Sequence, residues 1–358
     1  MLKSIALRTS VISNRTGDLR GILRKVRGVL QWLCANALAA SGVIWWIRQR
    51  FRRHGAVLAL TFHRVLDEGS YHCTHSQPEI IVREETFRKL LAYILRHYEP
   101  AHLTDALPGR IGRLARVVLT FDDGWADNYH IAFPIAREFG VPVLIFITPG
   151  LLHQSQPFWP EQVIELMQAL QPGVADSEVT EFIEALKKCC PEEREKRVRQ
   201  LREKASAAGL LATASHVDHT LLWQEIIEMH RGGVAFGSHT QSHLILTTAD
   251  ENTARQEVVE SKRAIESALG NTCETFSYPN GNWSPETKRI LADAGYRLAV
   301  TTDKGAWIES TDPLCIPRVN VYEENLVGPF GQFSPAMFEY TTLWKAWRAT
   351  AKLSRKKR

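Results

Sequence analysis

Short apolar runs that end in polar motifs, with amphipathic segments between them, dominate the middle of this chain. Val57 to Phe62 and Val117 to Phe121 are almost wholly apolar, as expected of strands that are buried on both faces. The second run leads into an Asp-Asp-Gly turn, a helical pattern over 127–139 with Gly140 as its expected cap, and another apolar run, Val141 to Ile147. This β-loop-α-β succession indicates α/β architecture with a parallel sheet or barrel.

The alternation is interrupted once and then resumes. Residues 158–231 show several helical segments and little strand signal, so we expect a helical insertion on one face of the domain, or a lid. Strand patterns return at 233–238 and continue to a last strand at 296–302. We therefore divide the chain into a basic N-terminal segment 1–54, a barrel domain 55–330 and a basic C-terminal tail 331–358.

The basic charge is concentrated at the two ends. Residues 1–54 carry eleven Lys or Arg against one acid, Asp18, and the stretch from Lys352 to Arg358 carries five basic residues and no acid. Because the whole chain has a formal charge of only +5, the body between these ends is acidic. An acidic body argues against a nucleic-acid-binding surface, and basic arms suit an anionic partner such as a lipid headgroup layer.

Residues 29–47 form an uncharged segment with arginines on both sides. A spanning helix needs about 20 apolar residues, but Gln31 and Asn36 dilute the hydrophobicity of this one. Three interpretations stay open: an interfacial helix with Trp45 and Trp46 near the headgroups, which we prefer, a true span, or a helix packed on the domain. A cleavable signal peptide fits poorly, because the apolar stretch begins far from the terminus and runs into a basic block.

The six cysteines show no framework spacing, so we expect free thiols, which favour a reducing compartment. Together with the basic ends, this favours a membrane-associated protein on the cytoplasmic face, and the periplasmic face stays open as the alternative.

Two acidic residues, Asp122 and Asp123, follow directly on the apolar run that ends at Phe121. They should therefore lie at the carboxyl end of a strand, where α/β barrels and open sheets place their catalytic groups. Gly124 permits a sharp turn, so both carboxylates can face one cavity, in which a cation would offset their repulsion. A turn in which both side chains cap the next helix is the alternative.

Two histidines, His239 and His243, follow the strand pattern that ends near Gly237. If the chain turns helical there, residues i and i+4 lie on one face, about 5–6 Å apart at Cβ, which suits chelation of one ion. A lone pair of this kind is a weak signal. Combined with the Asp pair, it predicts a metal with three protein ligands and one carboxylate left over to act as a base.

The order of these motifs resembles the polysaccharide deacetylases of carbohydrate esterase family 4, over about residues 55–320. The resemblance rests on Thr120-Phe121-Asp122-Asp123-Gly124, on His239-Thr240-Gln241-Ser242-His243 and on the turn Ser277-Tyr278-Pro279-Asn280-Gly281. It implies a distorted, incompletely closed (β/α) barrel that binds one divalent metal, often zinc. By position, Asp122 would be the general base, and Asp123, His239 and His243 would be the metal ligands. The turn residues Tyr278, Pro279, Asn280 and Gly281 would line the substrate groove and supply a backbone N–H to an oxyanion site.

Two parts of the family pattern are missing. Ser277 or Phe276 stands where an arginine should brace the base, and no histidine follows His243 to act as the general acid. A rearranged branch, which resembles the poly-N-acetylglucosamine deacetylases of biofilm export systems, takes that histidine from an N-terminal strand. Here this element corresponds to His63, although a polar residue that only caps the strand would look the same. Arg318 or Arg64 could replace the missing brace.

The residues and the resemblance together predict a metal-dependent hydrolase that removes acetyl groups from N-acetylated amino sugars of a polysaccharide or lipid-linked glycan. The partners expected are the glycan and a membrane surface, with no nucleic acid. An O-acetyl esterase and a catalytically degenerate glycan-binding module stay open as other functions.

Overall fold

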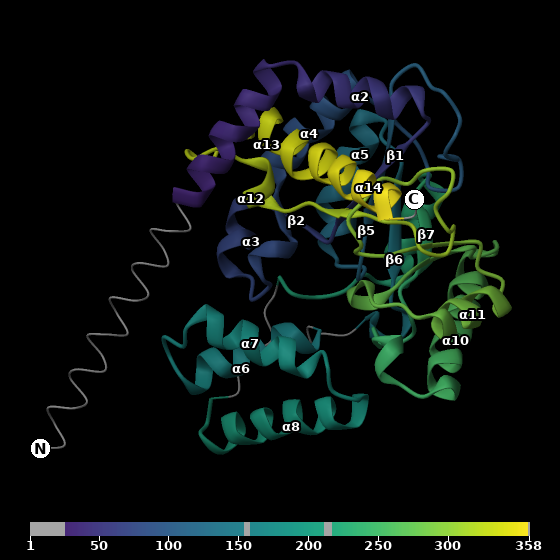
Figure 1. The fold of residues 1–358 in the computed structure, drawn as a ribbon. Coiled ribbons are helices and arrows are strands. Elements are labelled where there is room, and N and C mark those ends of the chain that lie inside the picture. The colour runs from purple at the N-terminus through teal and green to yellow at the C-terminus, as the bar shows by residue number, and fades with distance from the viewer. Residues whose placement is uncertain (1–25, 154–157, 211–216, 357–358) are drawn as a thin grey trace, which may run out of the picture.

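The computed structural model describes residues 26–153, 158–210 and 217–356. At its centre is a curved, parallel sheet in the order β10-β1-β5-β6-β7-β8-β9, with β4 paired to the amino-terminal half of β5 (Figure 1). A separate two-stranded sheet joins β2 and β3. The strands are β1 Val57–Phe62, β2 Arg64–Leu66, β3 Ile81–Arg83, β4 Tyr98–Pro100, β5 Ala115–Phe121, β6 Val143–Ile147, β7 Ala235–Ser238, β8 Thr275–Ser277, β9 Leu298–Val300 and β10 Val319–Asn320.

Helices surround this sheet, and short helical turns connect several elements. The first described helix covers Val26–Ala40. It is followed by α2 Val43–Arg53, α3 Glu68–Cys73, α4 Glu84–His97, α5 Phe133–Phe139, α6 Trp159–Leu170, α7 Asp176–Leu186, α8 Pro191–Ala207, α9 Trp223–Arg231, α10 Glu251–Leu269, α11 Pro285–Asp293, α12 Glu323–Leu326, α13 Pro335–Glu339 and α14 Lys345–Lys356. The turns are η1 Pro78–Ile80, η2 Asn128–Ala132, η3 Pro149–Leu151, η4 Leu246–Thr248, η5 Pro279–Gly281 and η6 Tyr340–Trp344.

The central strands are buried along their length because the sheet separates two cores. On β5 and β6, Val118 and Leu144 face the barrel interior, whereas Leu119 and Ile145 face the helices outside. Strands covered on both faces in this way read as continuous apolar runs, which is why the sequence reveals them. Among the described residues, β9 meets the segment that enters β10 through one isolated bridge, at Val300 and Ile316. The distorted, incompletely closed (β/α) barrel is thus confirmed.

The helical insertion forms a layer at one end of the molecule, in the lower part of Figure 1. Helices α6, α7 and α8 enclose a small apolar core of their own, which includes Val163, Ile183 and Val198. Helix α9 does not belong to it, because Ile226 and Met229 are buried in the main core. The insertion therefore ends before α9 rather than at residue 231, and α9 serves as the crossover helix that precedes β7.

Both ends of the described chain pack on the barrel. Helix α2 buries Ile44, Ile47 and Phe51, and the C-terminal helices bury Phe338 and Leu343 in the same core. The segment after residue 331 therefore packs on the barrel as far as the structure describes it. The Lys- and Arg-rich composition hid the apolar stripe of these helices. The basic residues within 1–25 and 357–358 lie outside the described residues.

No single helix in the described part of the chain is long and apolar enough to cross a membrane. The first helix and α2 are long and apolar enough for this only when they are taken together, and their axes are bent by 67° relative to each other.

Candidate active site

The alternation of side chains along β5 delivers Asp122 to the barrel interior. Val118 faces inward, so the two-residue period of a strand places Thr120 and Asp122 on the same side, at the carboxyl end. Asp123 and Gly124 then adopt φ values of 77° and 74°, which turn the chain sharply and aim the second carboxylate toward the same cavity. A Cβ at Gly124 would lie 3.0 Å from Ile147 Cγ2, so the turn also needs a residue without one.

Asp123, His239 and His243 converge on one point. The Asp123 Oδ1 atom lies 3.5 Å from His239 Nε2 and 3.3 Å from His243 Nε2, and one ligand atom from each residue lies within 4.8 Å of the others. Bonds of about 2 Å from each donor to one ion would fit this triangle. Among the described residues, this is the one group of His, Cys, Asp and Glu side chains with metal-ligand spacing.

Neighbouring groups orient two of these three donors. His239 Nδ1 lies 2.7 Å from the carbonyl oxygen of Ser277, which can only accept, so Nδ1 carries the proton and Nε2 presents its lone pair to the triangle. Burial lowers the pKa of His239 to about 4, which keeps the ring neutral. Trp125 Nε1 donates to Asp123 Oδ2 at 3.1 Å and leaves Oδ1 toward the imidazoles.

The three donors are arranged as expected for a site that holds a cation. A lone pair on His239 Nε2 and a carboxylate oxygen of Asp123 face each other, and two acceptors cannot bond without a positive group between them. Burial would raise the pKa of Asp123, but its contact with His243 and the other nearby imidazoles holds the pKa below its usual value. One carboxylate and two imidazoles, with one side open to a cavity, match the ligand set of catalytic zinc sites.

Backbone strain is concentrated at the same place. Five non-glycine residues in the described part of the chain have positive φ, and four of them belong to the motifs: Asp123, Thr240, His243 and Asn280. Such conformations cost about 1–3 kcal/mol each and persist where surrounding structure enforces them. Two of them lie in the loop 239–243, so the chain does not turn helical at the His pair. A loop with two left-handed residues brings the imidazoles together instead.

Arg318 and Ser277 hold Asp122 in place. Arg318 Nη1 donates to Asp122 Oδ1 at 2.8 Å and Nη2 donates to Oδ2 at 2.7 Å, while Ser277 Oγ donates to Oδ2 at 3.2 Å. Arg318 is fully buried, and its guanidinium lies over the ring of Phe146 inside the barrel. Burial would raise the pKa of Asp122, but the charge of Arg318 outweighs it and holds the pKa below its usual value.

The second candidate brace, Arg64, lies in a different network. Its guanidinium donates to Asp127 and Asp218 and lies 4.3 Å from the ring centre of Trp125. It therefore supports the tryptophan that orients Asp123, and makes no contact with Asp122 in the described structure.

His63 follows β1 and lines the same cavity as the metal-type triangle. Its Nδ1 atom is buried and has no hydrogen-bond partner among the described residues. Asn128 Nδ2 donates to the His63 carbonyl at 2.8 Å and fixes the backbone there.

The turn at 278–281 borders the cavity through Tyr278, Asn280 and Gly281, whereas Pro279 is buried beside it. The backbone N–H of Tyr278 donates to Val300 O at 3.2 Å, and that of Gly281 donates to Tyr278 O at 2.7 Å. Gly281 has φ 74° and no room for a side chain, since a Cβ would lie 2.0 Å from Thr302 Oγ1.

The helical insertion contributes residues that the sequence did not single out. Phe158, Trp159 and Glu161 line the cavity at the start of α6, and Lys187 does so at the end of α7. Glu161 is 4% exposed, and burial raises its pKa to about 8, so this acid is neutral at pH 7. Acidic residues are common in the first turn of a helix, where the helix dipole stabilises them. Nothing in the sequence therefore distinguishes Glu161 from an ordinary solvent-exposed acid.

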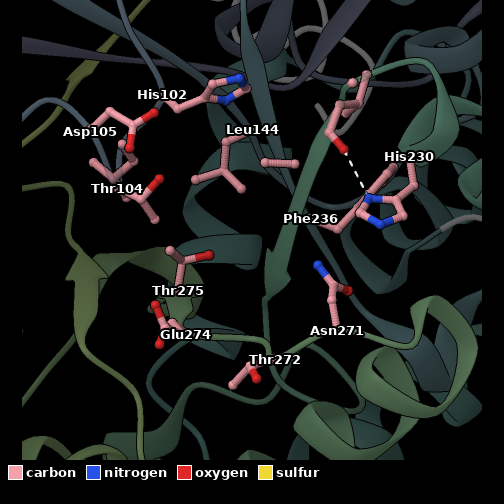
Figure 2. Close-up of a pocket in the computed structure, with 14 residues that line it drawn as sticks. His102, Thr104, Asp105, Leu144, His230, Phe236, Asn271, Thr272, Glu274 and Thr275 are labelled. Carbon is pink, nitrogen blue, oxygen red and sulfur yellow. Dashed lines mark hydrogen bonds between the residues drawn. The ribbon is translucent and has the colours of Figure 1, made fainter.

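A larger cavity, of about 320 Å³, lies at the other end of the barrel strands. Figure 2 shows its polar residues, among them His102, Asp105 and Glu274, around Leu144. No cluster with metal-ligand spacing occurs there among the described residues. The chemistry therefore belongs to the smaller cavity, of about 140 Å³, at the carboxyl ends of the strands.

Comparisons with known proteins agree with this geometry. The profile of the family described as polysaccharide deacetylase matches residues 183–299, which include the His pair and the turn at 278–281. The Bacillus subtilis protein YxkH, whose name places it among polysaccharide deacetylases, is 21% identical over 221 residues, which are 62% of this chain. The match spans 57% of the length of that relative.

Solved structures share the fold. The deacetylase PplD of Streptococcus pyogenes aligns with a TM-score of 0.52 at 18% identity, covering 77% of this chain and 96% of that one. IcaB from Ammonifex degensii gives the same TM-score and identity over 75% of this chain and 93% of its own. With the motifs gathered at one end of the barrel as described, this chain is similar to the polysaccharide deacetylase family.

Proposed function

We propose that this protein is a metal-dependent N-deacetylase of acetylated amino sugars in a polysaccharide or a lipid-linked glycan. The observation that supports the proposal most strongly is the meeting of Asp122 with Asp123, His239 and His243 at one cavity. Zinc is the proposed ion, because a carboxylate and two imidazoles with an open position are typical of its catalytic sites.

The ion, when bound, would supply Lewis-acid activation of the acetyl carbonyl and of a water molecule. Asp122, ionised at neutral pH, accepts the proton of the attacking water, and Arg318 keeps its carboxylate in one orientation. His63 gives a proton to the nitrogen of the leaving amine as the C–N bond breaks, so the products are acetate and a free amino sugar.

Of the four turn residues 278–281, one has a backbone N–H group available to stabilise an oxyanion. The N–H groups of Tyr278 and Gly281 are used by backbone carbonyls, and Pro279 has none. We propose the N–H of Asn280, whose left-handed conformation at φ 56° is part of the turn at the cavity, as the donor to the developing oxyanion. The sequence alone placed this donor near Tyr278.

The position of His63 favours amide over ester hydrolysis. An amine leaving group must be protonated before the C–N bond breaks, whereas an alkoxide leaves more readily without an acid. The similar deacetylase from Streptococcus pyogenes was solved in complex with acetate, the product that either reaction would release. The O-acetyl esterase therefore stays as the second candidate, and substrate panels separate the two.

Acetate release and metal content, measured together, test the proposal. Asp122→Asn should abolish acetate release from N-acetylated oligosaccharides while the metal stays bound, and His239→Ala should lose both. Asp105→Asn, which alters a carboxylate at the opposite cavity, should change neither. Full activity of Asp122→Asn would remove the base from the mechanism. Metal without any turnover in the wild type would favour a degenerate glycan-binding module.

The cytoplasmic face is the proposed location. All six cysteines are free in the structure, which supports a reducing compartment. Thiol-reactive labelling of intact cells against lysed cells tests this, because thiols on the cytoplasmic face should react only after lysis.

A further inference from the structure

The first helix and α2 expose an unusual concentration of large apolar side chains. Six of the thirteen exposed large hydrophobic residues in the described chain lie on these two helices. They are Val26, Val29, Leu30, Leu33, Trp45 and Trp46, with exposed fractions between 41% and 61%. Isolated exposed hydrophobics are ordinary on a soluble surface, but a cluster on neighbouring turns indicates a surface that binds something.

The three helices at this surface carry only basic charged residues. The first helix and α2 carry five arginines and no acid, and α14 carries five basic residues and no acid. Helix α14 lies beside α2 (Figure 1), with Trp347 packed edge-on against Trp46 at 5.9 Å. Arg50 lies over the ring of Trp46 and Arg348 over that of Trp344. Tryptophans with adjacent arginines above an apolar stripe are suited to the headgroup region of a bilayer.

Helix α2 is fixed on the barrel, which favours lying on a membrane over crossing it. Arg48 pairs with the buried Glu339, which also accepts from Tyr98 at 2.6 Å and from Tyr93 at 2.8 Å. Removal of α2 into a bilayer would leave this carboxylate without its cation and would expose the apolar core beneath the helix. Gly42, at φ 78°, allows the 67° bend that keeps both helices against the body.

The surface continues toward the catalytic cavity through a hairpin. Val327 and Phe333 form an antiparallel bridge, and the hairpin between them packs on Trp32 of the first helix, close to Gly328. Phe330, in this hairpin, is 87% exposed, the highest value among the large hydrophobics described. Arg83 of β3 donates to Gly331 O at 3.3 Å. Ile80, which directly precedes β3, lines the catalytic cavity.

We propose that the first helix, the outer face of α2, the 327–333 hairpin and α14 form one docking surface for a bilayer that contains anionic lipids. Apolar side chains enter the headgroup boundary, and the basic residues neutralise lipid phosphates. The docked protein then presents the rim of its cavity near the lipid surface, which favours membrane-bound glycans as substrates; this last consequence rests on the proposed function.

Vesicle sedimentation of the full chain tests the docking surface. We expect binding to vesicles of phosphatidylcholine mixed with phosphatidylglycerol, weaker binding as salt is raised, and little binding to phosphatidylcholine alone. Leu30→Glu combined with Leu33→Glu should reduce partitioning about tenfold or more, because two apolar contacts become anionic at an anionic surface. Leu210→Glu combined with Leu222→Glu, an exposed pair at the insertion with exposed fractions of 41% and 40%, should have no such effect.

Three results would overturn the docking surface: no vesicle binding by the wild type, equal losses in both double variants, or a dimer that Leu30→Glu with Leu33→Glu converts to a monomer. The last would make a second copy of the chain the occupant. Acetate release from a soluble oligosaccharide should be the same in all variants. Vesicle binding without any acetate release would leave the docking surface standing and refute the deacetylase alone.

Discussion

Replacement of Arg318 by Met is the perturbation whose consequences the structure defines best. Arg318 makes two charge-assisted hydrogen bonds to Asp122, at 2.8 and 2.7 Å, and both side chains are almost fully buried. Removal of one partner of a buried pair costs about 3–5 kcal/mol of the free energy of unfolding, because the other charge stays buried and unpaired. We expect a loss of that size at neutral pH in chemical denaturation.

The same change should shift the pH dependence of catalysis. An adjacent cation lowers an aspartate pKa by about 1–3 units, so without Arg318 the burial of Asp122 should dominate and raise its pKa. The acid limb of kcat/KM should move to higher pH by at least about one unit. Because the wild-type pKa is depressed, the contribution of the pair to the free energy of unfolding is present at neutral pH and is lost below about pH 4.

Arg64→Met provides the matched control, because Arg64 is equally buried and paired with carboxylates but does not contact Asp122. It should lower the free energy of unfolding without moving the acid limb. Arg318→Lys keeps a cation at this position and provides a second variant if Arg318→Met does not fold. The acid limb of Arg318→Lys should lie between those of the wild type and Arg318→Met. An unchanged acid limb in Arg318→Met, or an equal shift in Arg64→Met, would show that the Arg318 cation does not set the pKa of Asp122.

Three further predictions concern residues around the cavity. Trp125→Phe removes the N–H that orients Asp123 and should weaken metal affinity about 10–100-fold, measured by competition with a chelator; unchanged affinity would show that the indole only fills space. His63→Ala should reduce acetate release from N-acetylated substrates far more than from O-acetylated ones, and equal losses would argue against its role as the acid. Glu161→Gln should remove part of the pH dependence of stability: burial raises the pKa of Glu161 to about 8, so the wild type should lose stability as the pH rises from about 5 to about 8, and the variant should lose less. Parallel denaturation curves of the two proteins across that range would contradict the burial of this carboxyl in its neutral form.

Secondary-structure elements that are specified by a local pattern of apolar residues could be predicted from the sequence. The strand at Val57–Phe62 has the predicted boundaries, because a continuous apolar run specifies it. The position of Asp122 and Asp123 at the end of β5 follows in the same way. To predict that Asp123 lies close to His239 and His243, both the Asp-Asp-Gly motif and the His pair were needed, because neither motif alone is specific.

Features that depend on distant pairing could not be predicted. Arg318 is 196 residues from Asp122, and it reaches the barrel interior only because β10 pairs with β1. The left-handed residues Thr240 and His243 replace the expected helix, since tertiary contacts enforce a conformation that propensity disfavours. Glu161 looks like a solvated first-turn acid until the insertion is folded over the cavity.

Metal analysis of the purified wild type, Asp122→Asn and His239→Ala, prepared side by side, tests directly whether Asp123, His239 and His243 bind a metal ion. We expect one divalent ion per chain in the first two proteins and little in the third, because His239 belongs to the metal-type triangle and Asp122 does not. Retention of the ion in His239→Ala, or its loss in Asp122→Asn without unfolding, would contradict the assignment of Asp123, His239 and His243 as the metal-binding residues.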